Sequence, residues 1–115
     1  MGLFEAAMVL PDGVREIDAP TLHQHLGKVR IVDVREPFEY TGELGHIDGA
    51  ELIPLGNVAQ NAATWDKQAE VVLVCKSGGR SGQATRYFQG NGFARVINLR
   101  GGMMGWNAAG LPIKR

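Results

Sequence analysis

Short runs of apolar, mostly β-branched residues recur along the chain and alternate with segments of helical pattern. The clearest runs are residues 29–34, with few polar interruptions, and residues 71–74, which are entirely apolar. Runs of this kind are typical of strands whose two faces are both covered, as in a parallel sheet. Shorter runs at 50–53 and 96–99 predict two further strands, and residues 14–17 predict a strand at an edge.

Helical patterns fill the segments between these runs. Asp18 followed by Pro20 is a helix-start signal, because aspartate caps the first turn and proline is tolerated there, and it predicts a helix over 21–26. One or two helical turns are expected over 36–41, and a short helix over 57–63.

The longest predicted helix begins near Arg80. Its apolar or small positions Ser81, Ala84 and Phe88 fall on one face, while the polar positions between them turn outward. The helix is expected to end at 90–92, because Gly-Asn-Gly tolerates positive φ.

A last helix is predicted over 103–108. Strands that alternate with helices indicate an α/β fold, with three layers and a mainly parallel central sheet flanked by helices. The length of 115 residues fits one domain, which we expect over 14–115, preceded by an N-terminal arm or added packing segment at 1–13.

Charge and composition narrow the class of partner. The formal net charge is zero, so there is no global field to attract nucleic acid or an anionic membrane, and neither is expected as a partner. No apolar run approaches the ~20 residues that span a bilayer. The first residues include Glu5 and no basic residue before a short apolar stretch, which makes a poor signal peptide, so a cytoplasmic location is expected.

The chemistry of the chain concentrates where the run 71–74 ends. Cys75, the one cysteine of the sequence, follows it directly and is succeeded by Lys76, Ser77, Gly78, Gly79 and Arg80. Ligands of open α/β sheets bind at the carboxyl ends of strands. The two glycines let successive backbone N–H groups point inward as an anion-binding nest.

Three effects in this segment favour a thiolate at Cys75. They are the nest of N–H groups, the positive end of the helix that begins near Arg80, and the charges of Lys76 and Arg80. The alternative is a cysteine that only packs as a small buried hydrophobe. The sequence favours a nucleophile, because a packing cysteine gains nothing from the lysine, glycines and arginine that follow it.

Four segments, taken in order, carry a resemblance to a known family. They are IVDVRE at 31–36 with Glu39 and Tyr40, GHIDGA at 45–50, CKSGGR at 75–80, and GGMMGW at 101–106 with the Gly-Leu-Pro of 110–112. Together they resemble the rhodanese family of single-domain sulfurtransferases, over almost all of residues 14–113. The resemblance implies a rhodanese-like sheet of about five strands and a catalytic Cys75 that accepts a sulfane sulfur and passes it on.

The length of the loop separates this family from its relatives. Cell-cycle phosphatases and arsenate reductases have five residues between cysteine and arginine, whereas here there are four between Cys75 and Arg80. Position 74 is Val rather than the histidine of the phosphatase motif, and there is no second cysteine to resolve an arsenate reductase intermediate. A phosphatase-like hydrolase is therefore the least favoured alternative.

The sequence thus predicts a thiosulfate sulfurtransferase of rhodanese type. Cys75 takes sulfur from thiosulfate or a similar small donor as a persulfide and gives it to cyanide or a thiol, which can belong to a protein. The loop residues bind the substrate: Lys76, Ser77, Gly78, Gly79 and Arg80. No metal or organic cofactor is required. The alternative function is a persulfide-carrying or regulatory module that serves a partner protein.

Four other residues near these segments carry weaker hypotheses. Ser81 is either a helix N-cap or a small residue needed for packing. The family resemblance implies a structural role for Asp33, and His46 is expected to be structural through a hydrogen bond. Arg35 is expected to add to the positive field of the pocket.

Overall fold

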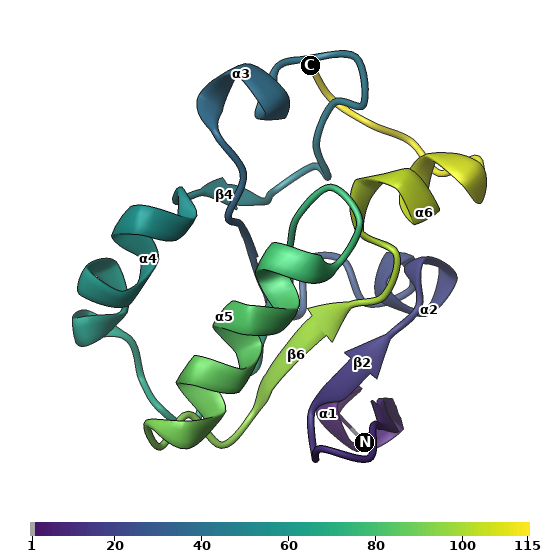
Figure 1. Cartoon of the computed structure of the whole chain (residues 1–115). Helices are drawn as coiled ribbons and strands as arrows, with labels where there is room; N and C mark the ends of the chain where they lie inside the picture. The colour runs from purple at the N-terminus through teal and green to yellow at the C-terminus, as the bar shows by residue number, and fades with distance from the viewer. Residues whose placement is uncertain (1) are drawn as a thin grey trace.

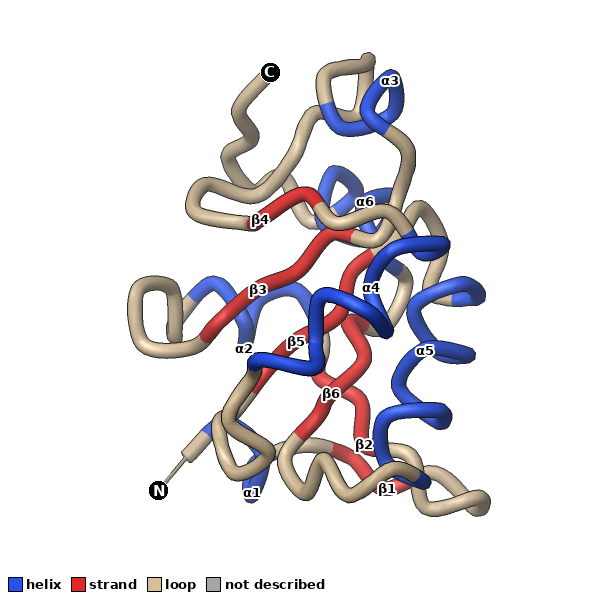
Figure 2. The backbone as a smooth tube through the Cα atoms, turned by 90° about the vertical axis from the view of Figure 1, so that its left-hand side faces the viewer, coloured by secondary structure: helices blue, strands red, loops and turns tan. Residues whose placement is uncertain are grey.

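Six strands form one sheet in the computed structural model of the chain, which describes residues 2–115. They are β1 (Met8–Val9), β2 (Arg15–Ile17), β3 (Arg30–Asp33), β4 (Glu51–Leu52), β5 (Val71–Val74) and β6 (Val96–Leu99). The strand order is β1-β2-β6-β5-β3-β4, and every neighbouring pair is parallel except β1 with β2. The mainly parallel sheet expected from the sequence is confirmed (Figure 2).

Helices cover both faces of this sheet (Figure 1). The helices of the described residues are α1 (Leu3–Ala6), α2 (Ala19–His23), α3 (Pro37–Tyr40), α4 (Leu55–Asn61), which continues as the 3₁₀ turn Ala62–Thr64, α5 (Gly79–Gly90) and α6 (Gly102–Ala108). Of these, α1, α2 and α6 pack on one face of the sheet and α4 and α5 on the other. No helix among residues 2–115 has the length and apolar character needed to cross a membrane.

The two faces of β5 belong to two separate hydrophobic clusters. Val72 and Val74 pack with α1, α2 and α6 on one side. Val71 and Leu73 pack with α4 and α5 on the other. Because side chains alternate along a strand, all four residues of β5 are buried, and this explains the uninterrupted apolar run at 71–74. Cys75 continues the alternation into the cluster beneath α5.

The expected helix over 21–26 is shifted toward the N-terminus. Asp18 caps the helix as predicted, with its carboxylate accepting from the Thr21 N–H at 2.9 Å, and the helix therefore begins at Ala19. It ends at His23 because the chain then tightens: the N–H groups of His25 and Leu26 bond to carbonyls three residues back. The helices expected over 36–41, 57–63, 80–90 and 103–108 are present as α3, α4, α5 and α6.

The sheet has one strand more than the five expected. The additional strand, β1, comes from the segment 1–13, of which Met1 lies outside the described residues; β1 pairs antiparallel with β2. Leu3 in the same segment is 1% exposed and belongs to the core. The strand was missed because two residues are too few to show a periodic pattern.

Ion pairs and a ring contact hold this segment to the domain. The Arg95 guanidinium bridges the carboxylates of Glu5 and Glu70, each at 2.7 Å. The Phe4 N–H donates to Glu70 at 3.0 Å, and the Arg15 guanidinium lies 4.4 Å from the centre of the Phe4 ring. Residues 2–13 therefore pack against the domain and do not extend from it.

Candidate active site

The loop between β5 and α5 stands at the carboxyl edge of the sheet. β5 ends at Val74, Cys75 follows, and α5 begins at Gly79. Gly78 caps α5 with φ of 101°, a conformation that side chains other than glycine rarely adopt. The backbone at Gly79 does not have a positive φ, so only the first of the two glycines is required by the turn.

The Cys75 sulfur receives hydrogen bonds from the start of α5. The Gly78 N–H donates to Sγ at 3.1 Å, and the Ser81 hydroxyl lies 3.3 Å from it. Burial raises the pKa of the Cys75 thiol, but the bonds from the Ser81 hydroxyl and from the backbone N–H groups of Ser81, Gly78 and Ser77 outweigh it. The pKa therefore lies below that of an ordinary thiol, as a nucleophile requires.

The N-terminus of α6 fixes the opposite side of the loop. The N–H groups of Met103 and Met104 donate to the carbonyls of Cys75 and Lys76, both at 2.9 Å. Gly102 permits this approach: its φ is 55°, and a Cβ there would lie 2.6 Å from the Lys76 carbonyl carbon. Because these bonds hold the carbonyls of Cys75 and Lys76 toward α6, the next N–H groups of the loop can point toward the Cys75 sulfur.

We expect Gly102→Ala to destabilise the protein by about 2 kcal/mol, because the new Cβ overlaps the loop backbone and the backbone has positive φ. Chemical denaturation measures the change. Gly56→Ala is the matched control: it lies inside α4 with open space around it, and it should stabilise by about 0.5 kcal/mol. Equal unfolding free energies in the two variants would contradict the close-approach argument.

The two cations of the loop have different surroundings. Arg80 makes a two-pronged ion pair with Glu39 of α3, with N–O distances of 2.7 and 2.8 Å. Lys76 is exposed, and no carboxylate of residues 2–115 lies within ion-pair distance of it. From the sequence, both cations were expected to favour the thiolate. In the structure Arg80 is paired with Glu39. The main causes that lower the pKa of Cys75 are hydrogen bonds rather than these cations.

The Arg80–Glu39 pair makes stability depend on pH in acid. The hydrogen bond with Arg80 is the main cause that lowers the pKa of Glu39 from 4.5 to about 2. A carboxyl with a depressed folded-state pKa contributes stability above its unfolded pKa and loses it as the pH falls through the folded value. We expect the difference in unfolding free energy between wild type and Glu39→Gln to shrink from pH 4.5 to pH 2. Denaturation curves at several pH values test this, and a constant difference would contradict it.

A buried ion pair stands behind the loop. The Arg35 guanidinium and the Asp33 carboxylate are 1% and 0% exposed and lie 2.7 Å apart. Arg35 also donates to the carbonyls of Glu39 and Gly45, which ties α3 and the following turn to the sheet. Asp33 thus has the structural role that was expected. Arg35 was expected to add to the positive field of the pocket. The adjacent Asp33 carboxylate balances the Arg35 charge, so this contribution is small.

Other residues singled out from the sequence take structural positions. His46 Nδ1 lies 2.9 Å from the Tyr40 carbonyl oxygen, and its ring stacks on the Tyr40 ring, as the structural interpretation expected. Ser81 is not an N-cap, because Gly78 holds that position. Ser81 is instead a fully buried residue of α5, in contact with the sulfur.

Two residues at the site were not predicted as site residues, although Glu39 was named among the residues of the family resemblance. Glu39 comes from α3, and nothing in its local pattern links it to Arg80, which is 41 residues away. Asn98 of β6 lies 2.5 Å from the Ser81 hydroxyl and is 1% exposed. The signal for Asn98 was available: it is the one polar residue in the otherwise apolar run at 96–99.

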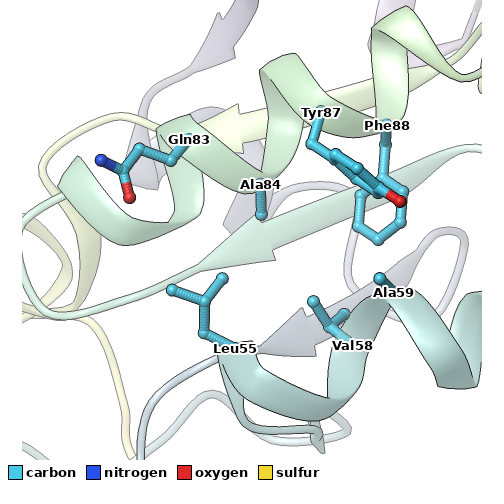
Figure 3. Close-up of a pocket in the computed structure, with 7 residues that line it drawn as sticks. All are labelled: Leu55, Val58, Ala59, Gln83, Ala84, Tyr87 and Phe88. Carbon is cyan, nitrogen blue, oxygen red and sulfur yellow. The ribbon is translucent and has the colours of Figure 1, made fainter.

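One hollow lies beside the loop and another beside α5. One, of about 500 Å³, is bordered by the loop cation and by side chains of α3, the turn after it and α6: Arg35, Phe38, Glu39, Gly42, Glu43, Leu44, Lys76 and Met104. The other, of about 240 Å³, lies between α4 and α5, where Leu55, Val58 and Ala59 face Gln83, Ala84, Tyr87 and Phe88 (Figure 3). The second hollow is apolar. Cys75 is not among the lining residues of either hollow, but the first is bordered by Lys76, the residue that follows Cys75 in the loop.

The residues described offer no cluster for a metal. Within 2–115, no group of three or more His, Cys, Asp or Glu side chains is placed to hold a metal ion. The functional groups gathered around Cys75 are hydrogen-bond donors: three backbone N–H groups and one hydroxyl. Such an arrangement suits a reaction in which negative charge sits on sulfur.

The chain is similar in sequence to proteins named as sulfurtransferases or sulfur carriers. A sulfurtransferase of Allochromatium vinosum is 40% identical over 103 residues, which cover 87% of this chain and 94% of that protein. The thiosulfate sulfurtransferase GlpE of Pseudomonas paraeruginosa is 38% identical over 79 residues, 69% of this chain and 70% of its own length. A putative sulfur carrier protein of Bacillus subtilis, YrkF, is 42% identical over 78 residues, which cover 68% of this chain and 41% of that protein.

Comparison with solved structures also finds rhodanese-like domains. A rhodanese-like domain protein from Staphylococcus aureus has a crystal structure that superposes with a TM-score of 0.73 at 34% identity, covering 87% of this chain and 98% of that one. The family model for the rhodanese-like domain matches residues 18–109. The chain therefore belongs to the rhodanese-like family of sulfurtransferases.

Proposed function

We propose that this protein transfers a sulfane sulfur from thiosulfate, or a donor like it, to a thiol through a persulfide on Cys75. The observation that carries the proposal is the set of hydrogen bonds on the Cys75 sulfur, from the Gly78 N–H and the Ser81 hydroxyl. These donors stabilise a negatively charged sulfur in a site where most water is excluded, which strengthens each bond.

In the first step the Cys75 thiolate attacks the outer sulfur of thiosulfate. A new sulfur–sulfur bond forms to Cys75 while the bond to the sulfonate sulfur breaks, and sulfite leaves with the electron pair. One negative charge remains on the terminal sulfur of the persulfide, so charge balances without any outside oxidant. In this proposal the loop N–H groups that bond to Cys75 Sγ also stabilise the charge on the terminal sulfur.

In the second step a thiophilic acceptor attacks the terminal sulfur. A thiolate acceptor becomes a persulfide, cyanide becomes thiocyanate, and in both cases the electron pair of the broken bond returns to Cys75 as thiolate. The hydrogen bonds that lower the pKa of Cys75 also make it a good leaving group here. The two half-reactions form a ping-pong cycle.

Access to the sulfur limits the shape of the donor. Cys75 is 1% exposed, so a donor must present a narrow terminal atom, such as the outer sulfur of thiosulfate. The rest of the donor or acceptor lies over the 500 Å³ hollow, where Phe38 and Met104 are 76% and 51% exposed beside Lys76. Apolar side chains next to a cation suit an organic thiol acceptor that carries a negative charge.

Intact mass after incubation with thiosulfate is the test of the proposal. We expect one additional sulfur atom on the wild-type protein, removed again by cyanide. Because the sequence contains one cysteine, the added sulfur is assigned to Cys75 without further mapping. A mass that stays unchanged with thiosulfate and with an organic persulfide would refute the function.

Lys76→Ala should lower kcat/KM for thiosulfate about tenfold, since a hydrogen bond to a charged group contributes about 1.5–3 kcal/mol. The physical reason is that Lys76 is the loop cation without an ion-pair partner among residues 2–115, while Arg80 is held by Glu39. Lys28→Ala removes the same charge from an exposed position and is the control. Equal losses in both variants would show that only the overall charge of the protein matters.

Steady-state turnover separates an enzyme from a carrier. A fast cycle with thiosulfate and a small thiol supports the enzyme. Persulfide formation with very slow turnover would instead favour a module that hands sulfur to a partner protein, the function that the name of the B. subtilis relative suggests.

A further inference from the structure

A buried polar chain leads from Cys75 through the core to the neighbouring strand. The Ser81 hydroxyl lies 3.3 Å from Cys75 Sγ and 2.5 Å from Asn98 Oδ1. Ser81 and Asn98 are 0% and 1% exposed, so water does not satisfy either group. A hydroxyl has a single hydrogen to donate. It therefore cannot donate to the sulfur and to the amide oxygen at the same time.

The orientation of the Asn98 amide is fixed by its other contacts. Its Nδ2 donates to the Glu16 carboxylate at 2.9 Å and to the Gly78 carbonyl at 3.3 Å. Both of these groups only accept hydrogen bonds, so the NH₂ end of the amide must face them and Oδ1 must face Ser81. The register of the sheet, in which Asn98 stands opposite Glu16, holds this arrangement in place.

We propose that Asn98 is a positioning residue that competes with Cys75 for the Ser81 hydroxyl hydrogen. This inference rests on the proposed role of Cys75 as a nucleophile. With Cys75 as a thiol, Ser81 donates to Asn98 Oδ1, and its oxygen accepts from the S–H. When Cys75 ionises, the hydroxyl hydrogen turns to Sγ, and Oδ1 loses its donor, because no other group of residues 2–115 donates to it.

The competition has a consequence for each half of the reaction. The thiolate before attack, and the thiolate released in the second step, both hold the hydrogen of Ser81. In the persulfide the negative charge sits on the terminal sulfur, so the hydrogen returns to Asn98. Asn98 thereby favours the persulfide over the thiolate, because a buried amide oxygen without its donor is unfavourable.

Several charged groups surround this chain and stay unchanged in the variants used below. Arg80 of α5 is paired with Glu39 of α3, and Arg35 is paired with Asp33 at the end of β3. Two more complete the set, Lys76 in the loop and Glu16 on β2. Substituting Asn98 also removes its bonds to Glu16 and to the Gly78 carbonyl, so its effect is assigned to the hydroxyl hydrogen only where that effect disappears in a Ser81→Ala background.

The test is the pH dependence of alkylation of Cys75 by iodoacetamide, a reaction of the thiolate alone. Ser81→Ala should raise the midpoint of the curve of alkylation rate against pH by about one pH unit, because the sulfur loses a hydrogen-bond donor. Asn98→Ala and Asn98→Leu should lower it by a similar amount, about one pH unit, because the hydrogen is then free for the sulfur. In a Ser81→Ala background the Asn98 substitutions should have no effect, since the hydroxyl through which they act is gone.

An Asn98 substitution that raises the midpoint, leaves it unmoved, or has the same effect without Ser81 overturns the inference. If neither Asn98 variant folds, NMR of the Asn98 side-chain amide in the wild type decides. Its resonances should shift with the ionisation of Cys75, and should not do so in Ser81→Ala; resonances that stay unmoved overturn the inference. Both measurements work on a protein that transfers no sulfur, so their failure is distinct from failure of the proposed function.

Discussion

Cys75→Ser is expected to lower the rate of sulfur transfer by about 10³-fold or more, and to abolish the gain of sulfur mass. Serine fills the same buried position, beside the Gly78 N–H and the Ser81 hydroxyl. Its hydroxyl is not ionised at neutral pH and cannot form a persulfide, so the covalent intermediate is lost while binding is retained. Thiocyanate formation from thiosulfate and cyanide measures the rate.

Two controls belong with this experiment. The thermal unfolding of Cys75→Ser should match that of the wild type, because the substitution changes one buried atom in a preserved set of contacts. Wild-type protein alkylated with iodoacetamide should be equally inactive, since the sequence contains one cysteine. Residual transfer of more than a few per cent in either preparation would contradict the persulfide mechanism.

Asp33→Asn is expected to destabilise the protein by about 3–5 kcal/mol, the largest effect on stability among the substitutions considered. The change keeps the size of the side chain but leaves the Arg35 guanidinium buried at 1% exposure without a counter-charge. Arg35 also holds the carbonyls of Glu39 and Gly45, so its displacement loosens α3 and the turn that follows. The unfolding free energy from urea or guanidinium titration measures the loss.

Glu51→Gln is the matched control for this prediction. Glu51 pairs with Arg30 at 2.6 Å in a similar geometry, but both side chains are more than a third exposed. Removing a carboxylate from an exposed pair should cost at most about 1 kcal/mol, because water screens the charges. If both substitutions changed the unfolding free energy equally, burial of the Asp33–Arg35 pair would not be what makes it important.

Most of the sheet was predictable from local pattern. The strands at 71–74 and 96–99 match β5 and β6, and the Asp18 cap was placed correctly. A strand covered on both faces must be apolar at nearly every position, so its signature lies in consecutive residues. Pattern failed for β1, a two-residue strand whose existence depends on pairing with β2.

The loop was predictable as a segment but not as a set of contacts. Local sequence predicted Cys75 at the end of a strand and a helix that begins near Arg80, one residue after the observed start at Gly79. It did not reveal that Ser81, one turn into α5, reaches back to the sulfur, or that Gly102 supports the loop from behind. These contacts depend on how a helix packs across a sheet, which neighbouring residues do not encode.

The sequence by itself predicted Cys75 as the reacting group, and it determined the length of the loop that carries Cys75 and the parallel sheet that places this loop at a carboxyl edge. These follow from residues close together in the chain, where spacing fixes geometry. The tertiary structure decided how the site is charged and which hydrogen bonds it makes: Arg80 is held by Glu39, and the Ser81 hydroxyl is shared between Cys75 and Asn98. Each of these pairings joins different elements of the fold or is set by their packing, so only the folded chain brings the partners within bonding distance.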